Sequence, residues 1–472
     1  MPRIPYKNPA PGTSTVGDAI RQRRGARGLT PLDQTLLNAP EIANGWNTLL
    51  GAIRNRNSLP DDIRELMILR VAARNSAKFE WIHHVHVGQD AGLTTQQLTI
   101  IRDLHTPLPL PSSPAPLSAF QAAALRFADA STFNVSVPQS RLDDLKPHLK
   151  DDQQLLECSA VVATYNMVSR FLVSLDVGDL VSETVPLPET EETEHDVEVE
   201  EGVKLHVKVA KRLENGNEAP WLVFVNSLMT NQTMWDPVLP RLSKKYNLLT
   251  FDQRGHGKSS VPPKPCTLEI LANDISTILS KLSIPTPIHA IIGVSQGGAT
   301  ALSFAQNHSS LFSRLIACDT QATSPAANAK AWDDRIALAR SSGSMDSLAD
   351  ATVPRWFPSG NASEFNESGR KEAFVRDMIT STPIEGFAMG AAALQGYDVL
   401  PGLAEKLKGK KVLFVAGERD GALPGVLKGL KEKLEKEGGV ESVEFEEIKG
   451  CGHLPMIDGA KDWLDVVEKF LQ

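Results

Sequence analysis

The spacing of hydrophobic and polar positions divides the chain into two parts. Before Val181, hydrophobic residues recur every three or four positions and no segment alternates with period two, which indicates helices and no strands. Thr30 and Pro31 are typical of a helix start, whereas the residues from 1 to about 30, rich in proline, glycine and arginine, are expected to be extended. Further helices are expected at residues 59–75, 78–92, 118–130 and 153–175.

The pattern changes after this all-α part, which we place at residues 1–182. Residues 183–195 carry prolines and a run of glutamates, so we expect a solvated acidic linker. The following segment, D-V-E-V-E-E-G-V-K-L-H-V-K-V, alternates with period two around Glu201 and Gly202 and predicts a β-hairpin.

Residues 196–472 alternate short apolar runs with amphipathic segments, which predicts a sheet covered by helices. The expected strands include W-L-V-F-V, Y-N-L-L-T-F and K-K-V-L-F-V, and residues 268–282 are an expected helix. From about residue 320 to 400 the strand pattern gives way to short helices, as in an inserted cap. The chain is therefore expected to be multidomain, all-α and then α/β with a helical cap.

Composition narrows the class of protein. A chain of 472 residues with 41% hydrophobic and 22% charged residues indicates a globular protein of two or more domains. A net charge of -8 argues against a nucleic-acid partner, and no apolar run approaches the ~18 residues of a membrane helix. The four cysteines lack C-x-x-C spacing, so we expect reduced thiols and a cytoplasmic protein. Since no glycine-rich phosphate loop follows a strand, we expect no cofactor.

A candidate nucleophile lies at the centre of H-A-I-I-G-V-S-Q-G-G-A-T, where G-x-S-x-G surrounds Ser295 between an apolar run and a helical one. A sharp strand-to-helix turn lifts the serine hydroxyl clear of the backbone, and side chains in place of the glycines would clash. An acid and then a base are expected downstream. Asp420 follows K-K-V-L-F-V-A-G, with Glu418 as a nearby competitor, and His453 follows the strand-like V-E-F-E-E-I. We therefore expect Ser295, Asp420 and His453 to act as nucleophile, acid and base.

Other residues are expected to surround this serine. The amides of Gln296, which follows it, and of Leu228, on the loop after W-L-V-F-V, are candidate oxyanion donors. We interpret Arg254 and His256, on the turn after Y-N-L-L-T-F, as structural. Arginines next to tryptophans in the cap could bind a carboxylate on an unsaturated ring of the substrate. The alternative is that the tryptophans only pack the cap. These cap residues are Trp332, Arg335, Arg355, Trp356 and Tyr397.

Several motifs in the second part carry a family resemblance. They are N-S-L at 226–228, M-W-D-P at 234–237, F-D-Q-R-G-H-G-K-S at 251–259, G-V-S-Q-G-G, W-D-D-R at 332–335, R-W-F at 355–357, G-E-R-D and G-H-L-P. Together they resemble the α/β-hydrolase family, and most closely 3-oxoadipate enol-lactonases, over about residues 196–472. The resemblance implies cofactor-free hydrolysis of a small lactone or ester. Met229 stands where a small residue is typical, which leaves the substrate open.

In the helical part, Glu80 and His84 lie four positions apart on one helix face, and Glu65, one helix earlier, could approach them. A carboxylate beside a histidine can hold one tautomer and raise its pKa, which suits a general acid or base. The alternatives are a surface ion pair and a metal cluster with His83 and His86. Because His84 and His86 cannot share a helix face, we expect no metal.

The helical part, over about residues 30–180, resembles the carboxymuconolactone decarboxylase family. The motifs that carry this resemblance are R-E-L-M-I-L-R-V-A-A-R-N, F-E-W-I-H-H and A-G-L. The resemblance implies Glu65, Glu80 and His84 as the decarboxylase-like site, and a homo-oligomer, a trimer or hexamer, assembled through the helical domain. In peroxidase-type relatives two cysteines stand at the places of Ala77 and Glu80, so thiol redox chemistry is not expected here.

The combined expectation is a lactone or ester hydrolase fused to a decarboxylase-like domain. If both sites work, a carboxylactone would be decarboxylated and the resulting enol-lactone hydrolysed to 3-oxoadipate in aromatic degradation. Two alternatives stay open. The helical domain could serve only for oligomerisation, or the hydrolase could act on a larger aromatic or polyketide lactone.

Overall fold

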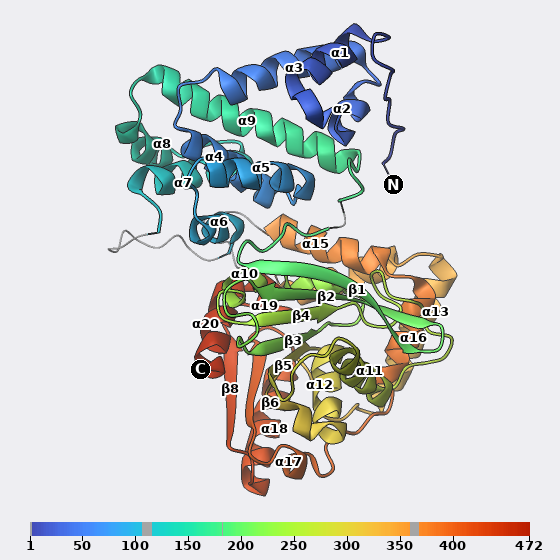
Figure 1. Ribbon diagram of the computed structural model, residues 1–472. Coiled ribbons are helices and arrows are strands. Elements are labelled where there is room, and N and C mark those ends of the chain that lie inside the picture. The colour runs from blue at the N-terminus through green and yellow to red at the C-terminus, as the bar shows by residue number, and fades with distance from the viewer. Residues whose placement is uncertain (1, 106–115, 182, 359–367) are drawn as a thin grey trace. The chain divides into compact units, whose positions relative to one another are not determined.

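The computed structural model describes residues 2–105, 116–181, 183–358 and 368–472 (Figure 1). The chain separates into two compact units, Met1–Pro188 and Glu189–Gln472. Ser182, at the predicted end of the helical domain, lies outside the described residues. In the described ranges, no helix has the length and apolar character needed to cross a membrane.

The first unit is built around one buried helix. Every residue of α4 from Ile63 to Ala73 is buried, and α4 packs against α5, α7 and α9. A buried ion pair between Arg70 Nε and Asp129 Oδ1, 2.6 Å apart, joins α4 to α7. The helices are α1 (Thr15–Arg24), α2 (Pro31–Leu36), α3 (Pro40–Asn55), α4 (Asp61–Arg74), α5 (Lys78–Asp90), α6 (Thr95–Arg102), α7 (Ala119–Asn134), α8 (Gln139–Leu145) and α9 (Asp152–Ser174).

The N-terminal segment differs from the prediction of an extended chain, because α1 forms within it. The hydroxyl of Ser14 accepts the Gly17 N–H at 3.1 Å and caps the helix, and Ile20 anchors it in the core. The predicted start at Thr30 is correct, since Thr30 forms a capping box with Asp33 at the beginning of α2.

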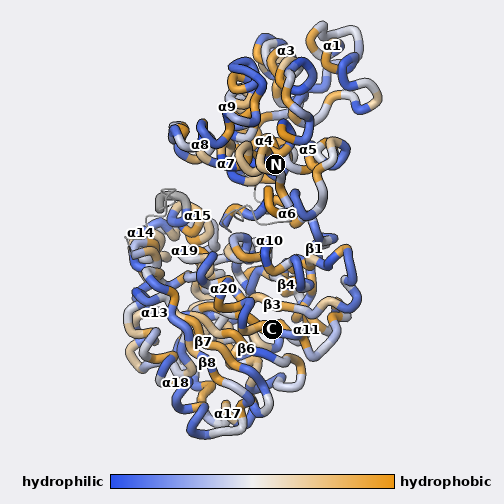
Figure 2. Tube along the Cα trace, turned by 90° about the vertical axis from the view of Figure 1, so that its left-hand side faces the viewer, coloured by the Kyte–Doolittle hydropathy of each residue, from blue (hydrophilic) through white to orange (hydrophobic). Residues whose placement is uncertain are grey.

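The second unit contains an eight-stranded sheet in the order β1-β2-β4-β3-β5-β6-β7-β8. β1, β2 and β4 pair antiparallel and all the following pairs are parallel. The central strands are buried on both faces and therefore consist almost entirely of hydrophobic residues, as the orange segments of β3, β6 and β7 show in Figure 2. The strands are β1 (Thr190–Glu200), β2 (Val203–Arg212), β3 (Trp221–Val225), β4 (Asn247–Phe251), β5 (Ile288–Val294), β6 (Phe312–Cys318), β7 (Lys411–Gly417) and β8 (Ser442–Ile448).

The predicted linker at residues 183–195 extends into this sheet, because β1 begins at Thr190. Its acidic side chains lie on an edge strand, where charge is tolerated, and Glu192 pairs with Lys208 of β2 at 2.8 Å. The predicted hairpin forms, and residues 201–202 separate its two strands.

Helices cover both faces of the sheet (Figure 1). Residues of α11, α12 and α18 belong to the same hydrophobic cluster as the strands. Arg241 of α10 joins α20 through Asp465 and Glu468, each 2.7 Å away. The helices outside the cap are α10 (Leu239–Leu242), α11 (Leu268–Lys281), α12 (Gln296–Asn307), α17 (Leu403–Lys406), α18 (Leu423–Glu437), α19 (Pro455–Asp458) and α20 (Ala460–Leu471).

The described part of the predicted cap, about residues 320–400, contains four α-helices. They are α13 (Ala327–Ser342), α14 (Asp346–Trp356), α15 (Ser368–Ser381) and α16 (Ile384–Ala391). The backbone of α16 meets the turn after β4 so closely that a Cβ on Gly386 would lie 2.0 Å from the carbonyl oxygen of Gly255. Only glycine permits this contact.

Candidate functional site

Ser295 stands on a strained turn between β5 and α12. Its φ of 57° lies in the left-handed region, and a Cβ on Gly293 would lie 2.1 Å from the carbonyl oxygen of Gly297. The Ser295 N–H donates to the carbonyl of Cys318 at 2.9 Å, and the Thr320 hydroxyl donates to the carbonyl of Ser295 at 2.8 Å. The glycine requirement expected from the motif is confirmed, and the end of β6 holds the turn in place.

Asp420 and His453 meet at the carboxyl ends of β7 and β8. His453 Nδ1 lies 2.6 Å from Asp420 Oδ2. Burial disfavours the charged form of Asp420, but the charge and hydrogen bond of His453 help to hold its pKa below the usual value. The competitor Glu418 is exposed and accepts bonds from Lys449 and from the Gly450 N–H, so it is engaged elsewhere.

The structure brings the three predicted residues to one cavity of about 270 Å³. Ser295, Asp420 and His453 all line it. The Ser295 hydroxyl and His453 Nε2 form no hydrogen bond with each other or with any other described residue. Bonds between a nucleophile and its base are often long in unliganded enzymes and shorten when substrate binds.

The two predicted oxyanion donors also line this cavity. Among the described residues, neither the Leu228 N–H nor the Gln296 N–H has a hydrogen-bond partner. The neighbouring Met229 N–H, in contrast, donates to His256 Nε2 at 3.0 Å. Leu228 rather than Met229 therefore has the amide that is available to a ligand.

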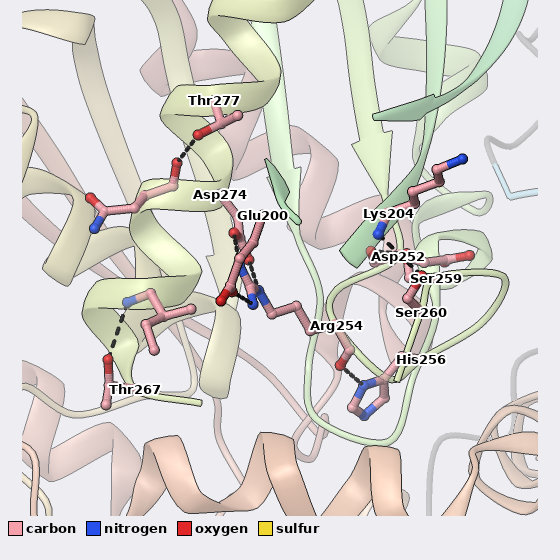
Figure 3. A network of polar contacts seen from close by, with 12 residues as sticks. Glu200, Lys204, Asp252, Arg254, His256, Ser259, Ser260, Thr267, Asp274 and Thr277 are labelled. Carbon is pink, nitrogen blue, oxygen red and sulfur yellow. Dashed lines mark hydrogen bonds and ion pairs between the residues drawn. The ribbon is translucent and has the colours of Figure 1, made fainter. Parts of the chain in front are cut away.

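The turn after β4, whose polar contacts Figure 3 shows, supports this loop through His256. His256 is fully buried, and burial lowers its pKa to about 4. The neutral ring donates from Nδ1 to the Arg254 carbonyl at 2.9 Å and accepts the Met229 N–H at Nε2. Arg254 is itself paired with Asp274 at 2.7 Å. These contacts agree with the structural interpretation of Arg254 and His256.

Two cap arginines face the same cavity. Arg335 of α13 and Arg355 of α14 line it, and the Arg335 guanidinium lies 4.5 Å from the centre of the Trp332 ring. Burial, and next the charge of Arg355, lower the pKa of Arg335. In the part of the chain that the structure describes, neither arginine forms an ion pair. Two guanidiniums that line one cavity and form no ion pair with a described residue favour an anionic ligand.

Trp356 has contacts that the sequence did not indicate. It lines the cavity but is only 4% exposed. Its ring stacks on the His453 ring with a centroid distance of 5.1 Å, and its carbonyl accepts the His453 N–H at 3.1 Å. Trp356 thus orients the histidine. No local pattern could predict this contact, because it depends on how α14 lies against the loop after β8.

The helical unit contains a second cavity, of about 420 Å³, lined by Glu65, Glu80 and His84. His84 Nδ1 lies 2.7 Å from Glu65 Oε2, and His84 Nε2 lies 3.2 Å from the Tyr165 hydroxyl. Arg54 Nε donates to that hydroxyl at 2.6 Å. Sequence analysis missed Tyr165 and Arg54. A signal for Tyr165 exists in α9, where it lies four positions before the buried Ser169 on one helix face.

Glu80 and His84 are not directly paired. Glu80 Oε2 accepts the Ser169 hydroxyl at 3.0 Å, and Glu80 Oε1 has no partner among the described residues. The surface ion pair is wrong, because Glu65, Glu80 and His84 are 2%, 2% and 7% exposed. The expected rise in the histidine's pKa is also wrong, since burial lowers the pKa of His84 more than Glu65 raises it.

Burial raises the pKa of Glu80 well above its usual value, which favours the protonated form of its carboxyl group. Within the described ranges, the histidines at 83, 84 and 86 do not converge as metal ligands would. In the described ranges, the group of three His, Cys, Asp or Glu side chains that lie close enough to share an ion is Asp319, Asp420 and His453, in the hydrolase unit. The Asp420–His453 hydrogen bond assigns that group to acid–base chemistry.

Two family models match the chain. The alpha/beta hydrolase fold model matches residues 220–460, and the carboxymuconolactone decarboxylase family model matches residues 40–124, within the helical unit. 3-Oxoadipate enol-lactonases 2 and 1 of Acinetobacter baylyi are 32% and 31% identical to this chain over 203 and 209 residues. These alignments cover 43% and 44% of this chain and 72% and 74% of the two enzymes.

A solved structure agrees with these matches. The crystal structure of the enol-lactonase from Burkholderia xenovorans LB400 is 30% identical, with a TM-score of 0.51, and the match covers 59% of this chain and 99% of that one. The chain therefore belongs to the alpha/beta hydrolase fold family, with a carboxymuconolactone decarboxylase family domain in the helical unit that precedes the hydrolase.

Proposed function

We propose that the chain is a serine hydrolase of a lactone or ester that carries a carboxylate, such as 3-oxoadipate enol-lactone. The observation that carries the proposal is one cavity that combines Ser295, the Asp420–His453 pair and two amides that bond no described residue. The two cap arginines, which form no ion pair with a described residue, support a carboxylate on the substrate. The relatives named as enol-lactonases support the lactone.

In this mechanism His453 Nε2 takes the proton of Ser295 as the hydroxyl attacks the carbonyl carbon. Asp420 accepts a hydrogen bond from the Nδ1–H of His453 and stabilises the imidazolium that forms. The amides of Leu228 and Gln296 donate to the oxyanion. The ring C–O bond then breaks, its oxygen takes the proton from His453, and water activated by the same histidine releases the acyl group.

The substitution Ser295→Ala tests this function in the full chain. Hydrolysis of an enol-lactone and of a p-nitrophenyl ester should fall by about four orders of magnitude or more, because loss of the nucleophile removes the covalent route. Ser341→Ala, the same change at an exposed cap serine, is the matched control and should keep the wild-type rate. Wild-type hydrolysis by the Ser295→Ala enzyme would reject the proposal.

A second function, decarboxylation of a carboxylated lactone, is favoured by the helical cavity. Arg54 lines this cavity and forms no ion pair with a described carboxylate, so its guanidinium is available to a substrate carboxylate. When carbon dioxide leaves, the electron pair of the broken C–C bond passes into the conjugated lactone. Glu80, whose pKa is raised by burial, can supply the proton that this anion takes up.

Carbon dioxide release by the Ser295→Ala protein separates the two functions. Release from 4-carboxymuconolactone should persist in Ser295→Ala and be lost when Glu80→Gln is added. If the wild type releases none, decarboxylation is rejected. The helical unit is then left with the alternative role of assembly, which the native mass of the full chain would reveal.

A further inference from the structure

The mechanism above makes no use of Asp319, although this residue lines the same cavity. Asp319 follows β6, is 1% exposed and has a φ of 45°, in the left-handed region. Its Oδ1 accepts the Gly417 N–H at 2.9 Å. Its Oδ2 has no hydrogen-bond donor among the described residues. A buried carboxylate oxygen without a donor is costly, so its protonation state requires an explanation.

The neighbours of Asp319 supply one. An oxygen of Asp319, an oxygen of Asp420 and a ring nitrogen of His453 all lie within 4.8 Å of one another. Two buried carboxyl groups this close do not both ionise, because their charges repel in a medium of low dielectric constant. Asp420 is the one that His453 contacts directly, at 2.6 Å. A proton on Asp319 Oδ2 removes the repulsion and turns the unsatisfied oxygen into a donor.

We propose that Asp319 is a positioning residue whose neutral carboxylic acid donates a hydrogen bond to Asp420 and holds that carboxylate against His453. The inference rests on the proposed hydrolase function. By sharing the negative charge of Asp420, this hydrogen bond limits how strongly Asp420 stabilises the imidazolium of His453. The base therefore releases its proton readily to the leaving oxygen.

The electrostatic surroundings agree with this assignment. Burial, and then the charge of Asp420, raise the pKa of Asp319 well above its usual value, while the hydrogen bond from Asp319 contributes to the lowered pKa of Asp420. The titratable and charged groups around the pair are His453, Arg355 and the thiols of Cys318 and Cys451. Burial raises the pKa of both thiols, that of Cys451 to about 12, so neither adds a charge at neutral pH.

Two substitutions of similar shape test the proposal. In Asp319→Asn, the amide oxygen can accept the Gly417 N–H while the NH₂ group donates to Asp420. This variant should keep kcat within about threefold and keep the pH profile of kcat/KM. Asp319→Leu lacks the donor, so kcat should fall by about 10- to 100-fold and the acidic limb of the profile should move to higher pH, since Asp420 then binds the imidazolium more strongly.

The same measurements can overturn the proposal. If Asp319 is ionised in the enzyme, Asp319→Asn removes a negative charge next to His453, and the acidic limb moves to lower pH. Wild-type kinetics of Asp319→Leu would show that the donor has no role. If the Leu variant does not fold, the pH profile of Asp319→Asn still decides between neutral and ionised Asp319. Activity of Ser295→Ala, measured in parallel, shows separately whether the serine mechanism itself has failed.

Discussion

Both units place a carboxylate next to a histidine, but the two histidines differ in their second ring nitrogen. His453 Nδ1 lies 2.6 Å from Asp420, and His84 Nδ1 lies 2.7 Å from Glu65. Nε2 of His84 is bonded to Tyr165, whereas no described residue bonds Nε2 of His453, whose ring lines an open cavity. A histidine accepts a proton from a substrate or nucleophile only through a free nitrogen. A short acid–histidine distance therefore does not by itself identify a base.

The contrast changes the roles expected in the helical unit. The hydrogen bonds run from Arg54 to the Tyr165 oxygen, from the Tyr165 hydroxyl to His84, and from His84 to Glu65. Each of the four side chains in this row of hydrogen bonds already has a partner. The carboxyl of Glu80 retains an oxygen that bonds no described residue, so Glu80 rather than His84 is the group that can exchange a proton with a ligand.

Replacing the two histidines gives the largest expected difference. His453→Ala should lower kcat for ester hydrolysis by about four orders of magnitude or more, because no other group can take the serine proton. His84→Gln should leave hydrolysis within about twofold, since His84 belongs to the other unit's cavity. Steady-state hydrolysis by both purified variants measures this. Comparable losses in the two would contradict the separation of the sites.

The cap arginines should have a smaller effect that depends on the charge of the substrate. Arg335→Gln and Arg355→Gln should each raise KM about tenfold for a lactone that carries a carboxylate, since a charge-assisted hydrogen bond contributes about 1.5–3 kcal/mol. KM for a neutral p-nitrophenyl ester should not change. Arg340→Gln is the control, because Arg340 is an exposed cap arginine paired with Glu385. Equal changes for both substrates would mean that the arginines only shape the cap.

The smallest expected effect concerns stability, and its sign differs between the two sites. Glu80 has a raised pKa in the folded protein, so the folded state holds its proton more tightly and its contribution to stability is lost as pH rises above the unfolded pKa. Glu80→Gln should therefore gain stability relative to the wild type between pH 4 and pH 8. Asp420 has a lowered pKa, so its contribution is lost as pH falls.

Thermal unfolding of Glu80→Gln and Asp420→Asn at pH 4 and pH 8 checks these signs. A change of about 1 kcal/mol would move the midpoint by about 2–4 °C in a unit of this size. The difference from wild type should grow with pH in both variants, as a gain in Glu80→Gln and as a loss in Asp420→Asn. A pH-independent difference for Glu80→Gln would show that this carboxyl is not held neutral.

The fold class and the convergence of Ser295, Asp420 and His453 could be predicted because each residue follows a strand, and parallel strands end at one edge of a sheet. Residues that depend on the packing of distant elements could not. The stacking of Trp356 on His453 leaves no periodic trace, and the helical spacing that marks Tyr165 as buried in α9 does not show that it meets His84. The burial of Glu80 was equally hidden, because charge alone suggests a surface position.

The contact between α16 and the turn after β4 has a consequence for redesign. Gly386 meets Gly255 backbone to backbone, and the Gln296 side chain donates to the Gly390 carbonyl at 2.6 Å. An exchange of the whole cap with that of another hydrolase would remove this contact and expose the loop that contains Leu228. An exchange limited to α13 would leave it intact, and would also keep Trp356 of α14 against His453. We therefore expect α13 to be the part of the cap that can be exchanged to select new substrates, while α14 and α16 stay with the catalytic domain.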